Sequence, residues 1–137
     1  MTDAFALDPR LSADTVPAFA LGLSDVRLMN DARFPWLILV PRRPGLAEII
    51  DLDAVDRARL MNEIALMSTA LKAATACHKL NVGALGNAVR QLHVHVIART
   101  IEDAAWPRPV WGFGEAVAYR PEDRHRLLAR IKAEVPT

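Results

Sequence analysis

The alternation of apolar and polar positions predicts two short strands, at 19–23 and 26–30, near the start of the chain. Ser24-Asp25 fits a tight turn between them. A continuous apolar run at 36–40, closed by Pro41, is typical of a strand buried inside a sheet. The first part of the chain is therefore expected to form sheet structure.

A long helix is predicted after the loop at 41–45. Asp53 fits its N-cap, because an Asp side chain accepts hydrogen bonds from free amides of a first turn, and Asp56 follows at a position that favours negative charge. Apolar residues then recur at helical spacing and form one stripe that faces a core: Leu60, Ile64, Met67, Leu71 and Ala74. The helix should fade near 78–79.

Two further strands are predicted at 80–85 and 89–98, around a turn at Gly86-Asn87. A short final helix is expected from 121 to about 133, with Pro121 in its first turn, where the missing N–H costs nothing. Strands, a long helix and then more strands indicate an α+β fold, in which a helix covers an antiparallel sheet. At 137 residues, the chain fits one domain over 1–137.

The composition of the chain limits the class of protein and the compartment in which it works. Apolar residues make up 52% of the chain and the formal net charge is +1, so the totals predict a packed core and no broad attraction to nucleic acid or membranes. Cys77 is the only cysteine, which rules out an internal disulfide and favours a reducing compartment. The first residues lack the apolar run of a signal peptide, and we expect a cytoplasmic protein without a membrane partner.

The strand predicted at 89–98 carries the candidate chemistry. Strand side chains alternate between two faces, so Gln91, His93 and His95 share one face while the residues between them pack beneath the helix. Two histidines beside a core are costly unless they are hydrogen-bonded or functional. Neighbouring backbone N–H groups near Gly86 can form a nest for an anion.

Three interpretations of this segment remain open. The histidines can be satisfied structural residues. They can also be metal ligands, although the candidates for a third ligand, His78, His125 and Cys77, are scattered, and no metal is expected. The favoured interpretation is nucleophilic attack on phosphorus. A neutral imidazole is populated near pH 7, and a carbonyl bound to one ring nitrogen fixes the other as the attacking lone pair.

The segment 91–97, Gln-Leu-His-Val-His-Val-Ile, resembles the signature of the histidine triad (HIT) family, in which histidines alternate with apolar residues. Asn81-Val82-Gly83 and the stretch 86–89 are similar to the family's Asn-x-Gly and Gly-Gln-Ser/Thr-Val motifs. The apolar run at 36–40 and the Pro-Arg-Arg-Pro that follows it also resemble a family strand and loop. The resemblance covers about 26–99 and leaves 100–137 as an extension.

The resemblance implies a five-stranded antiparallel sheet with one long helix packed on it. It also implies that His93 is the nucleophile, which takes up a nucleoside monophosphate at the α-phosphate of a substrate, and that His95 contacts the phosphate or the leaving group. Asn81 and Asn87 would hold phosphate oxygens, and Asn30 lies near a ribose-binding position.

Three positions depart from the family pattern. Gln91 stands in place of the first histidine, but it keeps the backbone carbonyl that orients the nucleophile in the family. Ala88 replaces a Ser or Thr that contacts the leaving group, and Trp36 stands where many members have histidine. The sequence resembles a proteobacterial branch with this Gln-x-His-x-His variant.

The function implied is a nucleotide-phosphate hydrolase or nucleotidyl transferase, for example one acting on dinucleoside polyphosphates. The alternative is a nucleotide-binding module with little or no turnover. No intrinsic cofactor is expected, although Mg²⁺ can arrive with a polyphosphate. The resemblance also implies a homodimer, in which two sheets join into one of ten strands.

Other conspicuous residues are expected to be structural. Trp106 and Trp111 are expected to pack the tail of the chain, with a nucleobase pocket as the alternative. The remaining expectations are a solvated loop for Arg42 and Arg43, surface positions for His78 and His125, and core positions for Met29, Met61 and Met67.

Overall fold

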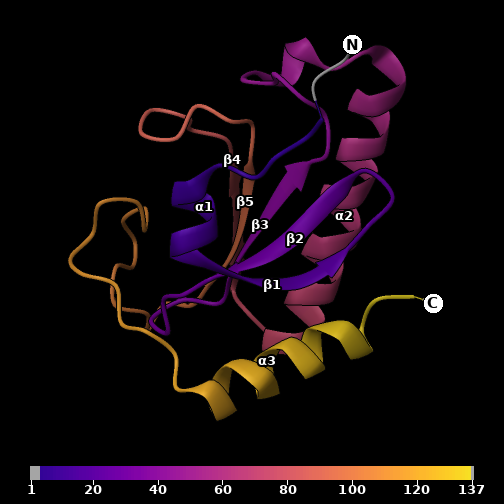
Figure 1. Ribbon diagram of the computed structural model, residues 1–137. Coiled ribbons are helices and arrows are strands. Elements are labelled where there is room, and N and C mark those ends of the chain that lie inside the picture. Colours follow the sequence, from indigo (N-terminus) through magenta and orange to yellow (C-terminus); the bar gives the residue numbers. More distant parts are fainter. Residues whose placement is uncertain (1–3, 137) are drawn as a thin grey trace.

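The computed structural model describes residues 4–136, which form a sheet flanked by helices (Figure 1). The elements in chain order are α1 (Pro9–Asp14), β1 (Thr15–Ala20), β2 (Ser24–Met29), β3 (Trp36–Pro41), the 3-10 turn η1 (Ile49–Asp51), α2 (Ala54–Thr75), β4 (Lys79–Gly83), β5 (Val94–Arg99) and α3 (Pro121–Ala133). The five strands form one sheet in the order β1-β2-β3-β5-β4, and every neighbouring pair is antiparallel. The predicted α+β class is confirmed.

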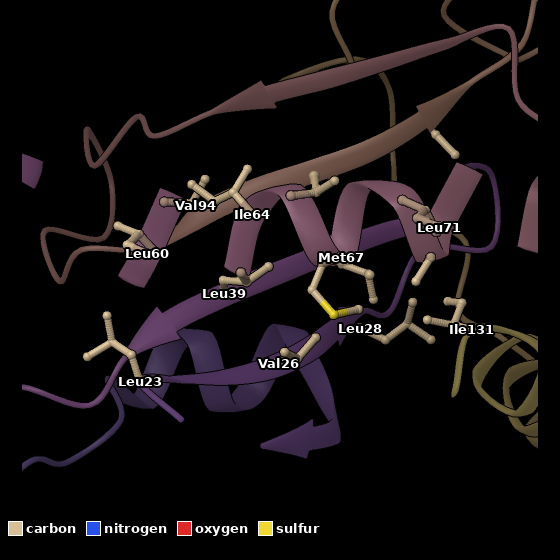
Figure 2. Packing of buried hydrophobic residues seen from close by; sticks show 14 of the residues in the cluster. Leu23, Val26, Leu28, Leu39, Leu60, Ile64, Met67, Leu71, Val94 and Ile131 are labelled. Atoms are coloured by element: carbon tan, nitrogen blue, oxygen red, sulfur yellow. The ribbon is translucent and has the colours of Figure 1, made fainter. Parts of the chain in front are cut away.

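Helix α2 covers one face of the sheet. Asp53 caps it by accepting a hydrogen bond from the Asp56 amide at 2.8 Å, and Ala76 ends it with φ of 52°. Its apolar stripe packs onto alternate residues of the strands, and Ile131 of α3 closes the end of this layer, as Figure 2 shows. The labelled members of this core are Leu23, Val26, Leu28, Leu39, Leu60, Ile64, Met67, Leu71, Val94 and Ile131.

The opposite face of the sheet is covered by α1 and by the long segment 100–120 (Figure 1). Leu11 of α1 and Val110 of that segment are buried against Ile38 and Ile97 of the central strands. The central strands β3 and β5 are therefore buried on both sides along their whole length. No helix of residues 4–136 has the length and apolar character needed to cross a bilayer.

Several predicted boundaries are wrong. The first strand covers 15–20 instead of 19–23, and Ser24-Asp25 begins β2, because the turn is closed earlier, by Leu21 N–H donating to the Ser24 carbonyl at 2.8 Å. Pro17 is tolerated in β1 because this is an edge strand. Met61 lies on the outer side of α2 with 64% of its surface exposed, so it is not a core residue.

The strand predicted at 89–98 begins only at Val94. Segment 89–93 is held by contacts outside the sheet, since Leu92 N–H donates to the Leu46 carbonyl at 3.0 Å. The strand predicted at 80–85 likewise ends at Gly83. The apolar alternation continues through 89–93, and it did not reveal where the ladder pairing stops.

Met67→Ala is expected to lower the free energy of unfolding by about 2–5 kcal/mol, because it empties a fully buried position between α2 and the sheet. Met61→Ala, on the same helix but exposed, is the control, with an expected change within about 0.5 kcal/mol. Urea denaturation measures both. Equal effects of the two variants would contradict this assignment of the core.

Candidate active site

The pleat of β5 separates a packing face from a candidate catalytic face. Val94 and Val96 point into the core beneath α2, whereas His95 and Ile97 point to the opposite layer. His93 precedes the strand, yet it stays on the side of His95, and the two ring centroids are 4.9 Å apart. The structure therefore brings together the two histidines that the sequence pattern placed on one face.

The ring of His93 is held by the backbone. Its Nδ1 lies 2.6 Å from the Gln91 carbonyl oxygen, and only 7% of the residue is exposed. A carbonyl oxygen can only accept, so His93 Nδ1–H is the donor and the neutral ring carries its lone pair on Nε2. This is the arrangement of an imidazole prepared for nucleophilic attack through Nε2.

The ring of His95 is held in the opposite sense. The indole N–H of Trp36 donates to His95 Nδ1 at 2.9 Å. Indole nitrogen only donates, so the neutral His95 ring carries its proton on Nε2. Burial, together with a smaller effect of the neighbouring His93, lowers the pKa of His95 to about 3, so His95 is an uncharged hydrogen-bond donor at neutral pH.

The side chain of Gln91 binds the N-terminal segment to the loop between β4 and β5. Its Oε1 accepts from the Asp8 amide at 2.8 Å, and its Nε2 donates to the Ala6 carbonyl at 2.8 Å. Arg10 adds a bond to the Ala88 carbonyl at 2.7 Å. An amide side chain offers both a donor and an acceptor to the backbone. Gln91 thus serves His93 with its carbonyl and the N-terminal segment with its side chain.

The loop between β4 and β5 offers free backbone donors. Gly86 adopts φ of 75°, a conformation that side-chain-bearing residues rarely take. Within residues 4–136, no amide N–H of 86–91 donates a hydrogen bond to the protein. Such unpaired N–H groups beside the histidines form a suitable cradle for phosphate oxygens.

Two adjoining cavities lie over the candidate catalytic face. The one we call the histidine cavity has a volume of about 240 Å³ and is lined by both histidines and by 85–89. The one we call the outer cavity has a volume of about 410 Å³ and is lined by Asn30, Trp36 and the segment 110–116. Asp14 and Met29 line both cavities. A third cavity, of about 240 Å³, lies between 47–50 and 84–86 and is also bordered by His93.

Two of the predicted binding residues lie apart from the histidine cavity. Asn30 borders the outer cavity, where its Oδ1 accepts from the Tyr119 amide at 2.9 Å. Asn81 lies on β4 opposite Ile97, and its Oδ1 accepts from the buried guanidinium of Arg99 at 2.8 Å. Asn87 and Gly86 line the histidine cavity itself.

The two tail tryptophans have different surroundings. Trp111 packs against His95 with ring centroids 5.3 Å apart, whereas Trp106 is partly exposed and lies over the guanidinium of Arg99. Trp111 therefore belongs to the site. The sequence analysis missed the indole N–H contact of Trp36 and the rim position of Asp14, and it placed Trp111 near the site only as the alternative to packing the tail. The apolar run at 36–40 hid the contact of Trp36, because the partner of its N–H lies 59 residues away.

Positive charge is scarce at the site. No Lys or Arg lines the histidine cavity, and Arg33 of the outer cavity is engaged by Asp31 at 2.8 Å. Arg42 and Arg43 form ion pairs with Asp25 and Asp56 and line none of the three cavities. Among the described residues, no three His, Cys, Asp or Glu side chains are grouped to hold a metal ion.

The sheet and the paired histidines are those of a known protein family. The model of the HIT domain matches residues 14–101, which is more than half of the chain, so the chain belongs to the HIT domain family. This match includes the sheet, helix α2 and both site histidines. No curated protein matches the chain.

Solved structures agree with this assignment along nearly the whole chain. A histidine triad protein from Sinorhizobium meliloti is 51% identical, with a TM-score of 0.94 and coverage of 96% of this chain and 97% of its own. One from Bradyrhizobium japonicum is 49% identical, with a TM-score of 0.96 and coverage of 98% and 100%. A third, from Marinobacter aquaeolei, is 41% identical, with a TM-score of 0.94 and 97% of both chains covered.

Stability should depend on pH through His95. An unfolded histidine titrates near 6.5 and folded His95 near 3, so between these pH values the unfolded chain binds a proton that the folded chain does not. The contribution of His95 therefore makes the free energy of unfolding fall by about 1.4 kcal/mol per pH unit as the pH decreases below 6.5.

His95→Gln is expected to flatten this dependence, whereas His125→Gln, at an exposed site, should retain it. Urea denaturation at intervals from pH 4 to pH 8 measures the difference between each variant and the wild type, in which the shared titration of carboxylates cancels. An unchanged slope in His95→Gln would show that His95 is protonated in the folded protein.

Proposed function

We propose that the protein is a nucleotide-phosphate hydrolase or nucleotidyl transferase that acts at an α-phosphate through a nucleotidyl-His93 intermediate. The observation that carries this proposal is the contact of 2.6 Å between His93 Nδ1 and the Gln91 carbonyl, because it leaves Nε2 as the nucleophile. Membership of the HIT domain family supports the same chemistry.

The proposed reaction has two displacement steps. The Nε2 lone pair of His93 forms a bond to the α-phosphorus, and the bond from phosphorus to the leaving group breaks with its electron pair on the leaving group. Water or another hydroxyl acceptor then attacks phosphorus, the N–P bond breaks with its electron pair returning to Nε2, and the proton that the acceptor loses passes to the solvent. In the intermediate, the positive imidazole ring keeps its Nδ1–H on the Gln91 carbonyl, which stabilises the developing charge.

The surroundings of His93 suggest where the parts of a nucleotide bind. The free N–H groups of 86–91 and the Nε2–H of His95 supply donors for the phosphate oxygens. The outer cavity, bordered by Asn30 and Trp36, has room for the nucleoside. Mg²⁺ enters this scheme only with a polyphosphate substrate.

Exposure to adenylated substrates, such as dinucleoside polyphosphates, should add the mass of one nucleoside monophosphate to the protein. His93→Ala removes the nucleophile and should abolish the adduct, while His125→Ala should leave it intact. Intact-mass spectrometry after rapid quenching without acid measures all three proteins. Nucleotide binding without an adduct from any substrate would instead favour the alternative, a binding module with little turnover.

We also propose that the protein forms a homodimer through β4. This edge strand pairs only with β5, and Val82 on it is 48% exposed, whereas the other edge, β1, is protected by Pro17 and an irregular register. Two copies joined at β4 would form a ten-stranded sheet.

Sedimentation equilibrium should give a mass twice the 15.1 kDa of one chain. Val82→Asp should shift the protein toward monomer, because it adds a negative charge to each of the two joined edges. Val117→Asp changes an equally exposed valine in the segment 100–120 and should leave the dimer intact. A monomeric wild type would overturn the dimer without affecting the proposed chemistry.

A further inference from the structure

His95 lies inside a cage of rings. Its ring centroid is 4.9 Å from that of His93, 5.3 Å from that of Trp111 and 5.7 Å from that of Trp36. Only 5% of the residue is exposed, and Trp36 Nε1–H occupies its Nδ1. The proton of this ring is therefore fixed on one nitrogen by a neighbour that can only donate.

We propose that Trp36 is a positioning residue that keeps His95 an uncharged Nε2–H donor, and that the site therefore acts on anhydrides of phosphoric acid rather than on phosphoramidates or alkyl esters. This inference rests on the proposed function of His93. An anhydride here is a nucleoside monophosphate joined through oxygen to a phosphate or a carboxylate, so that its leaving group departs as a stable oxyanion.

His95 is a poor general acid in this arrangement. Giving up its Nε2 proton would leave an imidazolate, because Nδ1 has no proton of its own and receives only the hydrogen bond of Trp36. Becoming a good acid would require protonation at Nδ1, which the indole N–H blocks. Burial keeps the pKa of His95 near 3, in agreement with this geometry.

The groups that face His95 do not change this conclusion. Across the sheet, its register partners are Ile38 on β3 and Gly83 on β4, neither of which is charged. From the covering layer come Trp111 and, at the rim, Asp14 of α1, whose side chain is exposed to solvent. His93 is the remaining titratable neighbour, and a positive charge on it opposes a second one on His95.

Apart from Asp14, whose exposed side chain lies at the rim, the rest of the histidine cavity carries no acidic side chain. Its wall beside the phosphate cradle consists of Asn87 and Ala88, an amide and a methyl group. A leaving phosphate or carboxylate needs no proton, whereas an amine or alkoxide does. The site thus holds a nucleophile and hydrogen-bond donors but lacks an acid for a basic leaving group.

The transfer step can be written without a proton donor. His93 Nε2 forms a bond to phosphorus, the bridging P–O bond breaks, and the electron pair leaves on the oxygen of a phosphate or carboxylate. A positive charge then resides on the His93 imidazole. An uncharged His95 at 4.9 Å can donate to the phosphoryl oxygen without repelling that charge.

The tautomer of His95 can be measured in the resting protein, without substrate. In ¹⁵N-histidine-labelled wild type, His95 should show an unprotonated Nδ1 and a protonated Nε2 from pH 5 to pH 8. Trp36→Phe removes the indole N–H but keeps an aromatic ring, and His95 should then populate the other tautomer and titrate at a higher pH. Trp111→Phe is the matched control, because the indole N–H of Trp111 has no partner within residues 4–136.

The leaving-group preference is measured by the rate at which the His93 adduct appears. We compare diadenosine polyphosphate and an acyl adenylate with an adenosine phosphoramidate of a simple amine, by intact mass in the wild type. The phosphoramidate should react at least about a hundredfold more slowly, which is the range that an absent general acid costs. In Trp36→Phe, the ratio of the anhydride rate to the phosphoramidate rate should decrease. The rate of adduct formation from the phosphoramidate should rise as the pH falls.

The outcomes separate this inference from the proposed function. If His95 of the wild type carries its proton on Nδ1, the proposed role of Trp36 is wrong, regardless of the spectra of the variants. Adducts from the phosphoramidate and the anhydrides at equal rates would overturn the substrate class while upholding the His93 nucleophile. Absence of any adduct would refute the proposed function and the substrate class with it, and the tautomer measurement would still decide the role of Trp36.

Discussion

The burial of β5 on both faces is the constraint on which the rest of the structure depends. One face carries Val94 and Val96 into the core beneath α2, and the other carries His95 and Ile97 into a second layer formed by α1 and the segment 100–120. A polar ring buried between these two layers destabilises the fold unless its nitrogen atoms have hydrogen-bond partners. The same burial that requires hydrogen bonds to the histidines also fixes how those rings are protonated.

The strand register explains why the site lies at this end of β5. Gly83 of β4 lies opposite His95, and a Cβ at this glycine would approach the Trp111 ring to 3.6 Å. That distance is an ordinary van der Waals contact, so Trp111 lies beside this end of β4 and also packs against His95. Just beyond Gly83 the ladder ends, and the chain leaves the sheet as the loop 84–91 with its free amide donors. The unpaired amide N–H groups, which we propose to bind phosphate, thus begin where the strand pairing ends.

Much of the fold and part of the site follow from local signals in the sequence. The helical stripe and the Asp53 cap predicted α2, and period-two alternation placed His93 and His95 together. These local signals failed to predict features that depend on contacts between residues far apart in the sequence. The pairing of β5 stops at Val94 because Leu92 bonds Leu46, and periodicity carries no information about such a partner. The contact of Trp36 with His95 was hidden for the same reason, inside a run that is typical of any buried strand.

The two histidines are chemically alike in sequence and opposite in the structure, and the difference comes from one atom beside each Nδ1. A carbonyl oxygen beside His93 draws the proton to Nδ1 and leaves Nε2 able to attack, whereas an indole N–H beside His95 forces the proton onto Nε2. The carbonyl is a backbone group, which any residue at position 91 supplies, so glutamine there is free to bind the N-terminal segment with its side chain. The indole is a side chain, so the role of His95 depends on the identity of residue 36. Departures from a family pattern therefore differ in consequence. A change that leaves a backbone contact intact preserves the ring orientation of the proposed nucleophile, whereas a change of a contacting side chain alters which nitrogen of its partner carries the proton.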